Sequence, residues 1–409
     1  METVEHSSIQ QSIPPKKRVV PSFENTEIAF SSRSNRELKQ AHLLFSVLGK
    51  PWMMDIGKRL TLFSLRMGLP IQGMIKKTIF RQFCGGETIA ECAKTTRVLD
   101  KFHIGTILDY SAEGKNSEAD FEHTANEVLK TIEVAHDNPH IPFCVFKITG
   151  LCKNNLLEKT STGLDSLSGD EKREYQKLEA RVEKICKRAA DTGTPVFIDA
   201  EDSWYQDTID RIAMKMIRRF NKKEAIVFNT LQMYRHDRLE HMKQAIKDAK
   251  AEGFIYAVKL VRGAYMEKER ERAKEKGYPS PIQPDKESTD RDFDAAILLG
   301  LDNLDHCAFS AGTHNEKSSL LLANEIDKRK LSRDHNRIYF AQLFGMSDHI
   351  SFNLSNAGYN VAKYVPYGPI SEVMPYLIRR AEENTSVAGQ TGRELSLIKK
   401  EIRRRKSNS

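Results

Sequence analysis

The chain has 409 residues, of which 39% are hydrophobic and 29% are charged. That balance excludes a globally disordered chain and is enough to bury one large core or two medium ones. The formal net charge of +8 is moderate for this length, so the composition indicates a soluble, folded protein of enzyme size rather than a domain that is basic throughout.

Much of the positive charge lies near the two ends of the chain, at 16–18 and at 399–406. Basic ends of this kind predict contact with an anionic surface, either a membrane or a nucleic acid. Solvated ends that bind nothing fit the same charge pattern equally well.

The six cysteines are scattered, without a Cys-x-x-Cys pair and without histidines at zinc-ligand spacing. We therefore expect reduced thiols in a reducing compartment, and no metal site.

No run of about 18 apolar residues occurs, so a membrane-spanning helix is not expected. Residues 1–11 contain no apolar run, and Glu2 and Glu5 argue against an Arg-rich presequence.

Four parts are expected along the chain. Residues 1–24 are rich in Ser, Gln, Pro and basic residues, which is typical of a flexible leader. Residues 25–90 carry apolar residues at helical spacing and form an N-terminal helical arm. Residues 91–390 form the main domain, and residues 391–409 form a basic C-terminal tail. Lys and Arg alternate with the apolar residues of the arm, a pattern that suits a membrane surface or packing against a partner domain.

Eight short runs rich in β-branched and aromatic residues alternate with longer amphipathic segments in the main domain. The runs are 103–110, 143–151, 195–200, 225–231, 255–261, 306–312, 338–344 and 361–365. Each is followed by a helix-like segment, such as 172–190 after a capping box at Ser168 and Glu171. Repeated strand and helix units predict parallel strands with helices outside. Because no GxGxxG follows an early strand, we predict an α/β fold of the (β/α)8 TIM-type barrel class, with the N-terminal helical arm attached.

Polar side chains recur where the predicted strands end, which is the end of such a barrel that carries the chemistry. They are Asp109, Tyr110, Lys147, Asp199, Glu201, Gln232, Tyr234, Lys259, Arg262, Tyr265, Thr313, His314, Asn315, Gln342 and Tyr364. Taken singly, each fits a structural hydrogen-bonding group as well as a functional one. Their convergence at one end of the barrel favours a functional site.

These residue types leave several chemistries open. Lys and Arg beside Thr, His and Asn, with a glycine that allows close backbone approach, suit a phosphate-bearing cofactor or substrate. Asp199 and Glu201 can orient Lys147. A metal bound by these acids and His314 is disfavoured, because one histidine and two acids lack the usual ligand-rich pattern. Lys147 or Lys259 can instead form a Schiff base, as in barrel lyases, if burial lowers its pKa.

The stretch 364–384 has the pattern of a strand end, a Gly-Pro turn and a helix. Four side chains fall on one face of that helix, namely Tyr376, Arg379, Arg380 and Glu383. A solvated basic face explains most Arg-Arg pairs. Here the neighbouring acids cannot satisfy both guanidinium groups with ideal geometry, so we predict that the two arginines bind a substrate carboxylate.

Six ordered motifs occur between residues 85 and 384. They are Phe-Lys147-Ile-Thr-Gly-Leu, Ile-Asp199-Ala-Glu201, Lys-Leu-Val-Arg262-Gly-Ala-Tyr265, Thr313-His314-Asn315, Gln342-Leu343-Phe-Gly-Met346 and Tyr376-Leu-Ile-Arg379-Arg380-Ala-Glu-Glu383. In this order they resemble the motifs of the proline dehydrogenase family. The resemblance implies a distorted (β/α)8 barrel that holds FAD and removes a hydride from C5 of L-proline to the flavin N5. The product would be Δ1-pyrroline-5-carboxylate, and the electrons would pass to a membrane quinone, as the first step of proline catabolism to glutamate.

The resemblance also implies roles for individual residues. The catalytic positions would be Lys147, Asp199, Tyr265, Arg379 and Arg380. The substrate-binding positions would be Lys147, Leu343, Tyr364, Tyr376, Arg379, Arg380 and Glu383. The FAD-binding positions would be Asp199, Gln232, Lys259, Arg262, Gly263, Ala264, Thr313, His314, Asn315 and Gln342. The family has further FAD contacts in the region of 281–290, where this sequence gives no residue-by-residue match.

Within this set, the two arginines would grip the proline carboxylate, and Glu383 would hold one of them in place. Leu343 would form an apolar wall, and Asp199 would hold the network around Lys147. Tyr364 would pack on the proline ring. A smaller residue is expected there in hydroxyproline dehydrogenases, so the tyrosine favours proline over 4-hydroxyproline.

A quinone acceptor implies peripheral contact with a respiratory membrane through the basic arm or the C-terminal tail. The sequence favours a cytoplasmic protein at a bacterial membrane, with the mitochondrial inner membrane or matrix as the alternative for a eukaryotic source.

Nothing resembles an aldehyde dehydrogenase module, so a separate pyrroline-5-carboxylate dehydrogenase is expected downstream. A nucleic-acid partner is not expected, because no basic motif is interleaved with aromatic residues. The runner-up enzyme is a Schiff-base aldolase or lyase that uses Lys147 or Lys259.

Overall fold

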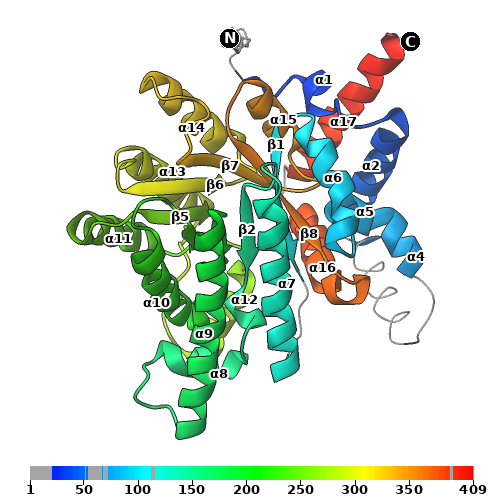
Figure 1. Ribbon diagram of the computed structural model, residues 1–409. Helices are drawn as coiled ribbons and strands as arrows, with labels where there is room; N and C mark the ends of the chain where they lie inside the picture. The colour runs from blue at the N-terminus through cyan, green and yellow to red at the C-terminus, as the bar shows by residue number, and fades with distance from the viewer. Residues whose placement is uncertain are drawn as a thin grey trace, which may run out of the picture.

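The computed structural model describes residues 21–50, 52, 53, 67, 72–111, 116–386 and 390–408. Eight parallel strands close into a barrel in the order in which they occur along the chain (Figure 1). They are β1 (Ile104–Tyr110), β2 (Phe143–Phe146), β3 (Val196–Ile198), β4 (Val227–Gln232), β5 (Tyr256–Val261), β6 (Cys307–Gly312), β7 (Ile338–Leu343) and β8 (Val361–Tyr367). β8 pairs with β1 along its whole length and closes the barrel. The (β/α)8 barrel predicted from the sequence is therefore confirmed.

Each predicted run overlaps an observed strand, and the bounds differ by at most two residues except at the end of β2. The ends of β2 and β8 are the two differences that bear on the site. β2 stops at Phe146, because Ile148–Gly150 turns into a short 3-10 helix, η2, directly after Lys147. β8 runs two residues past the predicted end to Tyr367, because its last residues pair with the end of β1 up to Tyr110. Both differences lie at carboxyl ends of strands, where a barrel of this class carries its site.

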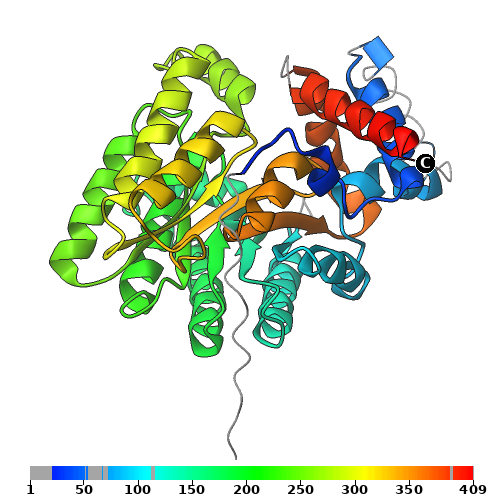
Figure 2. The ribbon, with the colours of Figure 1, turned by 90° about the horizontal axis from the view of Figure 1, so that it is seen from above.

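Helices surround the barrel as an outer layer (Figure 2). They are α6 (Ile89–Asp100), α7 (Glu118–His136), α8 (Asn154–Ser161), α9 (Gly169–Thr192), α10 (Ser203–Phe220), α11 (Arg238–Glu252), α12 (Met266–Lys276), α13 (Lys286–Leu301), α14 (Glu316–Lys328), α15 (Asp348–Asn356) and α16 (Ile370–Ser386). The predicted capping box is present at the start of α9, where Ser168 and Glu171 bond to each other's backbone N–H groups. No helix in the described ranges is both long and apolar enough to cross a bilayer.

Aromatic side chains fill the interior of the barrel. The rings of Phe143 and Phe197 stack with their centroids 4.5 Å apart, and Phe228 packs edge-on against both. Because the interior is a packed core, a ligand has access to the barrel only at its ends.

The N-terminal arm and the last helix pack together on α16. The arm consists of α1 (Thr26–Ala29), α2 (Asn35–Leu48), α4 (Gln72–Ile75), the π-helix η1 (Lys76–Phe80) and α5 (Arg81–Phe83). Helix α17 (Gln390–Ser407) lies beside α2, on the same side of the barrel as α16 (Figure 2). Apolar side chains of the arm, α16 and α17 form a second core, separate from the core of the barrel.

The end of the chain differs from the basic tail predicted for residues 391–409. The segment forms α17, and Leu397 and Ile398 are each 1% exposed within the second core. Arg405 donates a hydrogen bond of 2.9 Å to the main-chain oxygen of Phe30, so a side chain expected to meet either solvent or an anionic surface instead joins α17 to the arm. The prediction was wrong because many charged residues surround the few apolar ones that decide the packing.

A buried ion pair ties β8 to the arm. Lys363 is 0% exposed, and its Nζ lies 3.0 Å from a carboxylate oxygen of Asp348 at the start of α15. Arg33, between α1 and α2, donates to the other oxygen of Asp348 at 2.8 Å. Burial by itself would raise the pKa of Asp348, but Lys363 and Arg33 hold it below its ordinary value. Lys363 also donates to the main-chain oxygen of Met346 at 2.5 Å, so its charge is well satisfied.

We expect Lys363→Met to lower the free energy of unfolding by about 3 kcal/mol, because it removes one partner of a buried ion pair. Chemical denaturation measures the change. As a matched control, Lys328→Met removes a lysine whose side chain is 75% exposed. That control should change stability by less than about 0.5 kcal/mol, and equal losses in the two variants would contradict the role given to the buried pair.

Candidate active site

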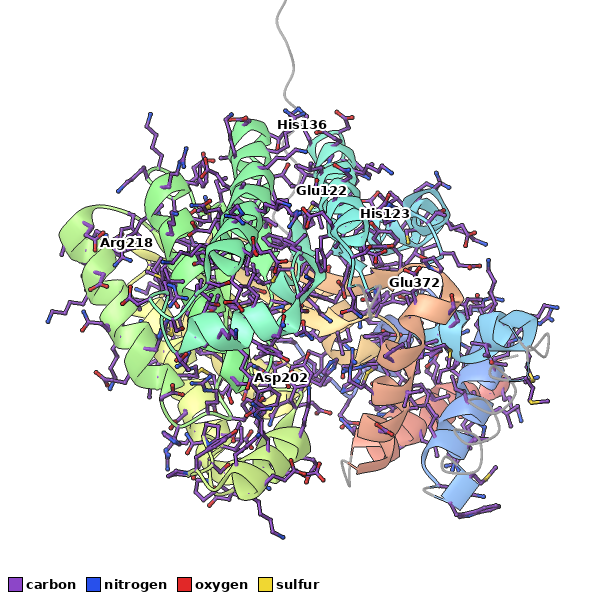
Figure 3. The ribbon with its side chains drawn as sticks, turned by 90° about the horizontal axis from the view of Figure 1, so that it is seen from below. Glu122, His123, His136, Asp202, Arg218 and Glu372 are labelled. Carbon is purple, nitrogen blue, oxygen red and sulfur yellow. The ribbon has the colours of Figure 1, made fainter. Side chains whose placement is uncertain are left out.

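The strand ends bring most of the predicted site residues to one mouth of the barrel. They lie in or just beyond the strands: Lys147 after β2, Asp199 after β3, Gln232 in β4, Lys259 in β5, Arg262 and Gly263 after β5, Thr313 and His314 after β6, Gln342 and Leu343 in β7, and Tyr364 in β8. Helix α16 follows β8 and carries Tyr376, Arg379 and Arg380, together with the main chain of Glu383, whose side chain lies outside the described part of the chain. Figure 3 shows Asp202, which follows β3, and Glu372, in the first turn of α16, on the side of the molecule seen from below. The polar residues thus share one rim, as the parallel strands require.

Lys259, Asp199 and Tyr364 form one closed hydrogen-bonded unit. Lys259 donates to the Asp199 carboxylate and, at 2.6 Å, to the Tyr364 hydroxyl. The hydroxyl donates in turn to the same carboxylate at 2.9 Å. The Lys259 ammonium also lies 4.4 Å from the centre of the Tyr364 ring, a distance suited to a cation–π contact. These contacts stabilise the charged ammonium and fix the Tyr364 ring at the mouth.

Lys147 lies near two buried carboxylates, Asp109 in β1 and Glu201 after β3. Burial raises the pKa of Glu201 to about 7, and the positive charge of Lys147 opposes that rise. Burial also raises the pKa of Asp109, again against the charge of Lys147. Both acids are held in place: Glu201 accepts from the backbone N–H of Thr149 at 3.0 Å, and Asp109 accepts from the Ser111 hydroxyl at 2.6 Å. Lys147 therefore has two carboxyl groups near it whose positions are fixed by hydrogen bonds.

Arg262, directly after β5, is fixed by three hydrogen bonds. Its Nε donates to Asp290 at 2.6 Å, and its two terminal nitrogens donate to Thr313 at 2.6 Å and to Ser318 at 2.9 Å. The guanidinium carbon lies 4.3 Å from the centre of the Phe293 ring. Protein contacts alone therefore set the orientation of this planar cation.

The side-chain amides of β4 and β7 are also held by their neighbours. Gln232 donates to a main-chain oxygen after β3 at 2.7 Å. Gln342 donates to the main-chain oxygen of Thr313 at 3.1 Å and accepts from the Ser351 hydroxyl at 2.8 Å. Asn315 accepts from backbone N–H groups in the first turn of α14 and caps that helix. The rim between β4 and β7 thus presents a preorganised set of hydrogen-bonding groups.

His314 connects this rim to the last helix. Its Nδ1 lies 2.9 Å from the Ser347 hydroxyl, and the backbone N–H of Ser347 donates to Glu394 of α17, which is 3% exposed. Burial, with the charges of Lys363 and Arg380, lowers the pKa of His314 to about 3. The imidazole is therefore neutral at physiological pH.

The chain turns at Gly263, between Arg262 and the start of α12. Gly263 has a φ of +135°, and a Cβ there would lie 2.5 Å from the Tyr234 ring, so only glycine fits this backbone. Gly263 and Ala264 are exposed, which leaves their backbone accessible. Burial raises the pKa of the next residue, Tyr265, to about 12, so its phenol is neutral at physiological pH.

Helix α16 brings two guanidinium groups to the same mouth. Arg380 is 8% exposed, and its guanidinium carbon lies 5.2 Å from the centre of the Tyr376 ring. Arg379 is half-buried. Burial raises the pKa of Asp202, and Lys268 and Arg379 are among the cations that oppose that rise. Arg380 acts on His314 after β6, so the two arginines of α16 act on charged and polar groups that follow β3 and β6.

The sequence did not predict four side chains that bond to the predicted site residues or support them. They are Asp290 and Ser318, which bond to Arg262, Ser347, which contacts His314, and Glu394, which accepts from Ser347. Asp290 lies in the segment 281–290 that matches no family motif, and its one sequence signal is its spacing of four residues from Lys286, which donates to it. The two serines carry no signal, because single serines after strands are common. Glu394 lies in the segment predicted as a tail.

No group of three His, Cys, Asp or Glu side chains among the described residues is arranged to hold a metal ion.

A closed (β/α)8 barrel with charged and polar side chains fixed at the carboxyl ends of its strands has the architecture of a barrel enzyme. A family model described as proline dehydrogenase matches residues 92–393. "Proline dehydrogenase 1, mitochondrial" of Dictyostelium discoideum is 32% identical, over 93% of this chain and 74% of that protein. "Carbapenem antibiotics biosynthesis protein CarD" of Pectobacterium carotovorum subsp. carotovorum is 33% identical, over 85% of this chain and 90% of that protein.

Among solved structures, proline utilization A from Bdellovibrio bacteriovorus, inactivated by N-propargylglycine, matches with a TM-score of 0.70 and 20% identity. The match covers 88% of this chain but only 38% of that one, so it supports the fold alone. The family match settles the class more narrowly: this chain belongs to the proline dehydrogenase family. It is an oxidoreductase that oxidises proline in proline catabolism, and the family to which it belongs is FAD-dependent.

Glu201 gives the fold a pH dependence that a Glu201→Gln variant should lack. Burial raises the pKa of Glu201 to about 7 in the folded chain, compared with about 4.3 for an exposed glutamate. A raised pKa means that folding favours the protonated form. The stability that the Glu201 carboxyl group contributes to the folded chain is therefore complete below about pH 4.3, and it is lost as the pH rises to about 7.

Relative to the parent chain, the stability of Glu201→Gln should therefore increase across this range by a total on the order of 3 kcal/mol. Denaturant unfolding at a series of pH values measures the difference. Glu240→Gln, at a side chain that is 78% exposed on α11, serves as the control. A Glu201→Gln difference that stays constant with pH would rule out this titration.

Proposed function

We propose that this enzyme removes a hydride from C5 of L-proline with FAD as the acceptor, giving Δ1-pyrroline-5-carboxylate, and that a membrane quinone next takes the electrons. The observation that carries the proposal is the pair of adjacent arginines on α16, of which Arg380 is 8% exposed and lies against the ring of Tyr376. Two planar cations on one helix suit bidentate binding of a carboxylate.

The residues of β4 to β7 fit the polar parts of FAD. Arg262, held by Thr313 and two other partners, would bind the pyrophosphate or lie near the flavin ring. The exposed backbone of Gly263 allows close approach of a large ligand. The other residues proposed to hold FAD are Asp199, Gln232, Lys259, Ala264, Thr313, His314, Asn315 and Gln342. When bound, FAD supplies the acceptor for two electrons and a proton, taken as a hydride.

The protein's own groups then bind and orient the substrate. Arg379, Arg380 and Lys147 would fix the carboxylate, which holds C5 in one orientation. The combined positive charge of these residues also lowers the pKa of the substrate amine, so the neutral amine needed for hydride loss is favoured. Tyr364 and Leu343 would form apolar walls that exclude water from the proline ring.

The remaining proposed residues position this pocket. Lys259 and Asp199 hold the Tyr364 hydroxyl from two sides, so the ring cannot turn away without breaking both contacts. Tyr265, Tyr376 and Glu383 would complete the pocket as shaping and bracing residues. A bulky, fixed Tyr364 leaves little room for a ring hydroxyl, and we therefore propose a preference for proline over 4-hydroxyproline.

The contacts of Lys259 argue against the Schiff-base aldolase as an alternative. Its ammonium meets the Asp199 carboxylate and the face of the Tyr364 ring, and both stabilise the charged form. Imine formation needs the neutral amine, so this lysine is poorly suited to that chemistry.

We further propose that the enzyme works at the surface of a respiratory membrane, either bacterial or mitochondrial. The sequence favours a bacterial, cytoplasmic setting, whereas the name of the Dictyostelium relative includes the word mitochondrial. A separate pyrroline-5-carboxylate dehydrogenase would consume the product. No nucleic-acid partner is proposed.

An anaerobic absorbance spectrum of the purified protein, before and after addition of L-proline, tests the reaction. The expected result is a flavin band that bleaches with L-proline and bleaches more weakly with 4-hydroxyproline. A flavin band unchanged by proline would contradict the proposed substrate. A colourless protein that does not take up FAD would contradict the proposed cofactor.

Arg380→Lys should raise the KM for proline by about ten-fold or more, because a point charge cannot replace a bidentate fork. Steady-state kinetics with a soluble quinone measures the change. Arg291→Lys, at a side chain that is 68% exposed on α13, is the matched control and should leave KM unchanged. An unchanged KM in Arg380→Lys would exclude the carboxylate clamp.

A further inference from the structure

The turn between β7 and α15 connects the two proposed halves of the site. It begins at Leu343, the residue proposed as an apolar wall beside proline, and it ends at Ser347, whose hydroxyl contacts His314 on the proposed cofactor side. Leu343 pairs with Tyr364 of β8 and packs both against the aromatic interior of the barrel and against the second core. The backbone of this turn therefore decides where the Leu343 side chain lies.

The turn itself has a tight backbone. The backbone N–H of Met346 donates to the main-chain oxygen of Leu343 at 3.3 Å, which closes a four-residue turn. Gly345, its third residue, has a φ of +76°, a value that favours glycine. Ser347 follows with a φ of +51°, which is uncommon for a residue with a side chain. Such a residue keeps this conformation only where neighbouring contacts hold it.

Two side chains from other parts of the fold bond to the carbonyl groups of the turn. Lys363 of β8 donates to the main-chain oxygens of Leu343 at 3.3 Å and of Met346 at 2.5 Å. Gln82 of α5 donates to the main-chain oxygen of Gly345 at 2.6 Å, across 263 positions of sequence. Three of the four carbonyl groups of the turn are thus fixed from outside it.

Gln82 lies closer to the turn than one hydrogen bond requires. A Cβ on Gly345 would lie 1.9 Å from the main-chain oxygen of Gln82, so the backbone of α5 rests directly on the glycine. The side-chain oxygen of Gln82 accepts from Arg33 at 3.2 Å, and Arg33 also bonds to Asp348 at the start of α15. The amide is therefore oriented from both of its ends, with its NH2 group on the turn.

We propose that Gln82 is a positioning residue for substrate selection. By fixing the turn that begins at Leu343, it sets how closely the apolar wall fits the five-membered ring of proline. The role rests on the proposed function, which takes Leu343 as that wall. Because α5 belongs to the arm and lies outside the barrel (Figure 1), Gln82 acts through Leu343 rather than on the substrate. A wall held in one position selects by ring size, because an added methylene group finds no room.

Gln82→Glu tests the contact with the least change of shape. Glutamate keeps the length of the side chain and an acceptor for Arg33, but it has no N–H to donate to Gly345. Hydrogen–deuterium exchange in a peptide that covers 343–347 should become about five-fold faster, the effect of losing one ordinary hydrogen bond. Unchanged exchange there would overturn the proposal without reference to turnover.

Substrate discrimination is the second measurement. L-Pipecolate carries the carboxylate and amine of L-proline on a ring that is larger by one methylene group. In kcat/KM the parent chain should favour L-proline by about 10- to 200-fold, the usual discrimination for one methylene group in an apolar pocket. In Gln82→Glu this ratio should fall about five-fold, because the wall can move away from the larger ring. A ratio equal to that of the parent chain would overturn the role in selection.

Two control variants separate positioning from a general loss of stability. Gln244→Glu makes the same substitution at an exposed side chain of α11, which donates to Asp248 at 2.7 Å. Arg238→Met removes one partner of a buried ion pair with Asp210, between α10 and α11 and away from the turn. Neither should change the substrate ratio. An equal fall of the ratio in Arg238→Met would assign the effect to stability and overturn the proposal.

Gln82→Met keeps the test decisive if a carboxylate beside Gly345 prevents folding. Methionine has a similar length, no charge and no N–H to donate, so it should lower the ratio to the same extent. A parent chain that does not oxidise L-proline would contradict the proposed function and this role with it. A parent chain that oxidises L-proline, with the same ratio in Gln82→Glu and Gln82→Met, would contradict this role alone.

Discussion

The apolar packing of α16 is the interaction on which the candidate site depends. Val373 and Leu377 are 0% and 1% exposed in the second core, and burying each such side chain stabilises the fold by roughly 1.5–3 kcal/mol. That packing fixes the helix that carries Arg379 and Arg380. Because both arginines lie on α16, any movement of this helix displaces both guanidinium groups together. The arm and α17 are thus part of the support of the site.

Cations at the mouth are placed next to carboxylates that are themselves fixed. Lys259 meets Asp199, and Arg262 meets Asp290, at contacts that the strand ends set. Burying a cation without such a partner costs free energy, so the pairing stabilises both cations in their buried or half-buried positions. Glu201 takes up a proton more readily than an exposed glutamate because its burial raises its pKa by more than the charge of Lys147 lowers it.

Much of the fold follows from local patterns. The barrel was predictable because a strand-like run followed by a helix-like segment repeats eight times along the sequence. The ordered motifs identified the residues of the mouth, although their individual roles stay predictions. Contacts between distant parts of the sequence were not predictable: Arg262 is braced by Ser318, which is 56 positions away on another helix. The composition of 391–409 predicted a basic tail, because the charged residues of α17 outnumber the buried Leu397 and Ile398.

Helix α17 shows why the barrel alone is an incomplete description of this enzyme. Its Glu394 accepts from the backbone of Ser347, whose hydroxyl contacts His314 on the proposed cofactor side. Its Arg393 donates to Glu316 in the first turn of α14 at 2.8 Å. Leu397 and Ile398, one turn further along the same face of α17 as Glu394, belong to the second core that holds α16 on the substrate side. One helix at the end of the chain is therefore in contact with the supports of both halves of the mouth.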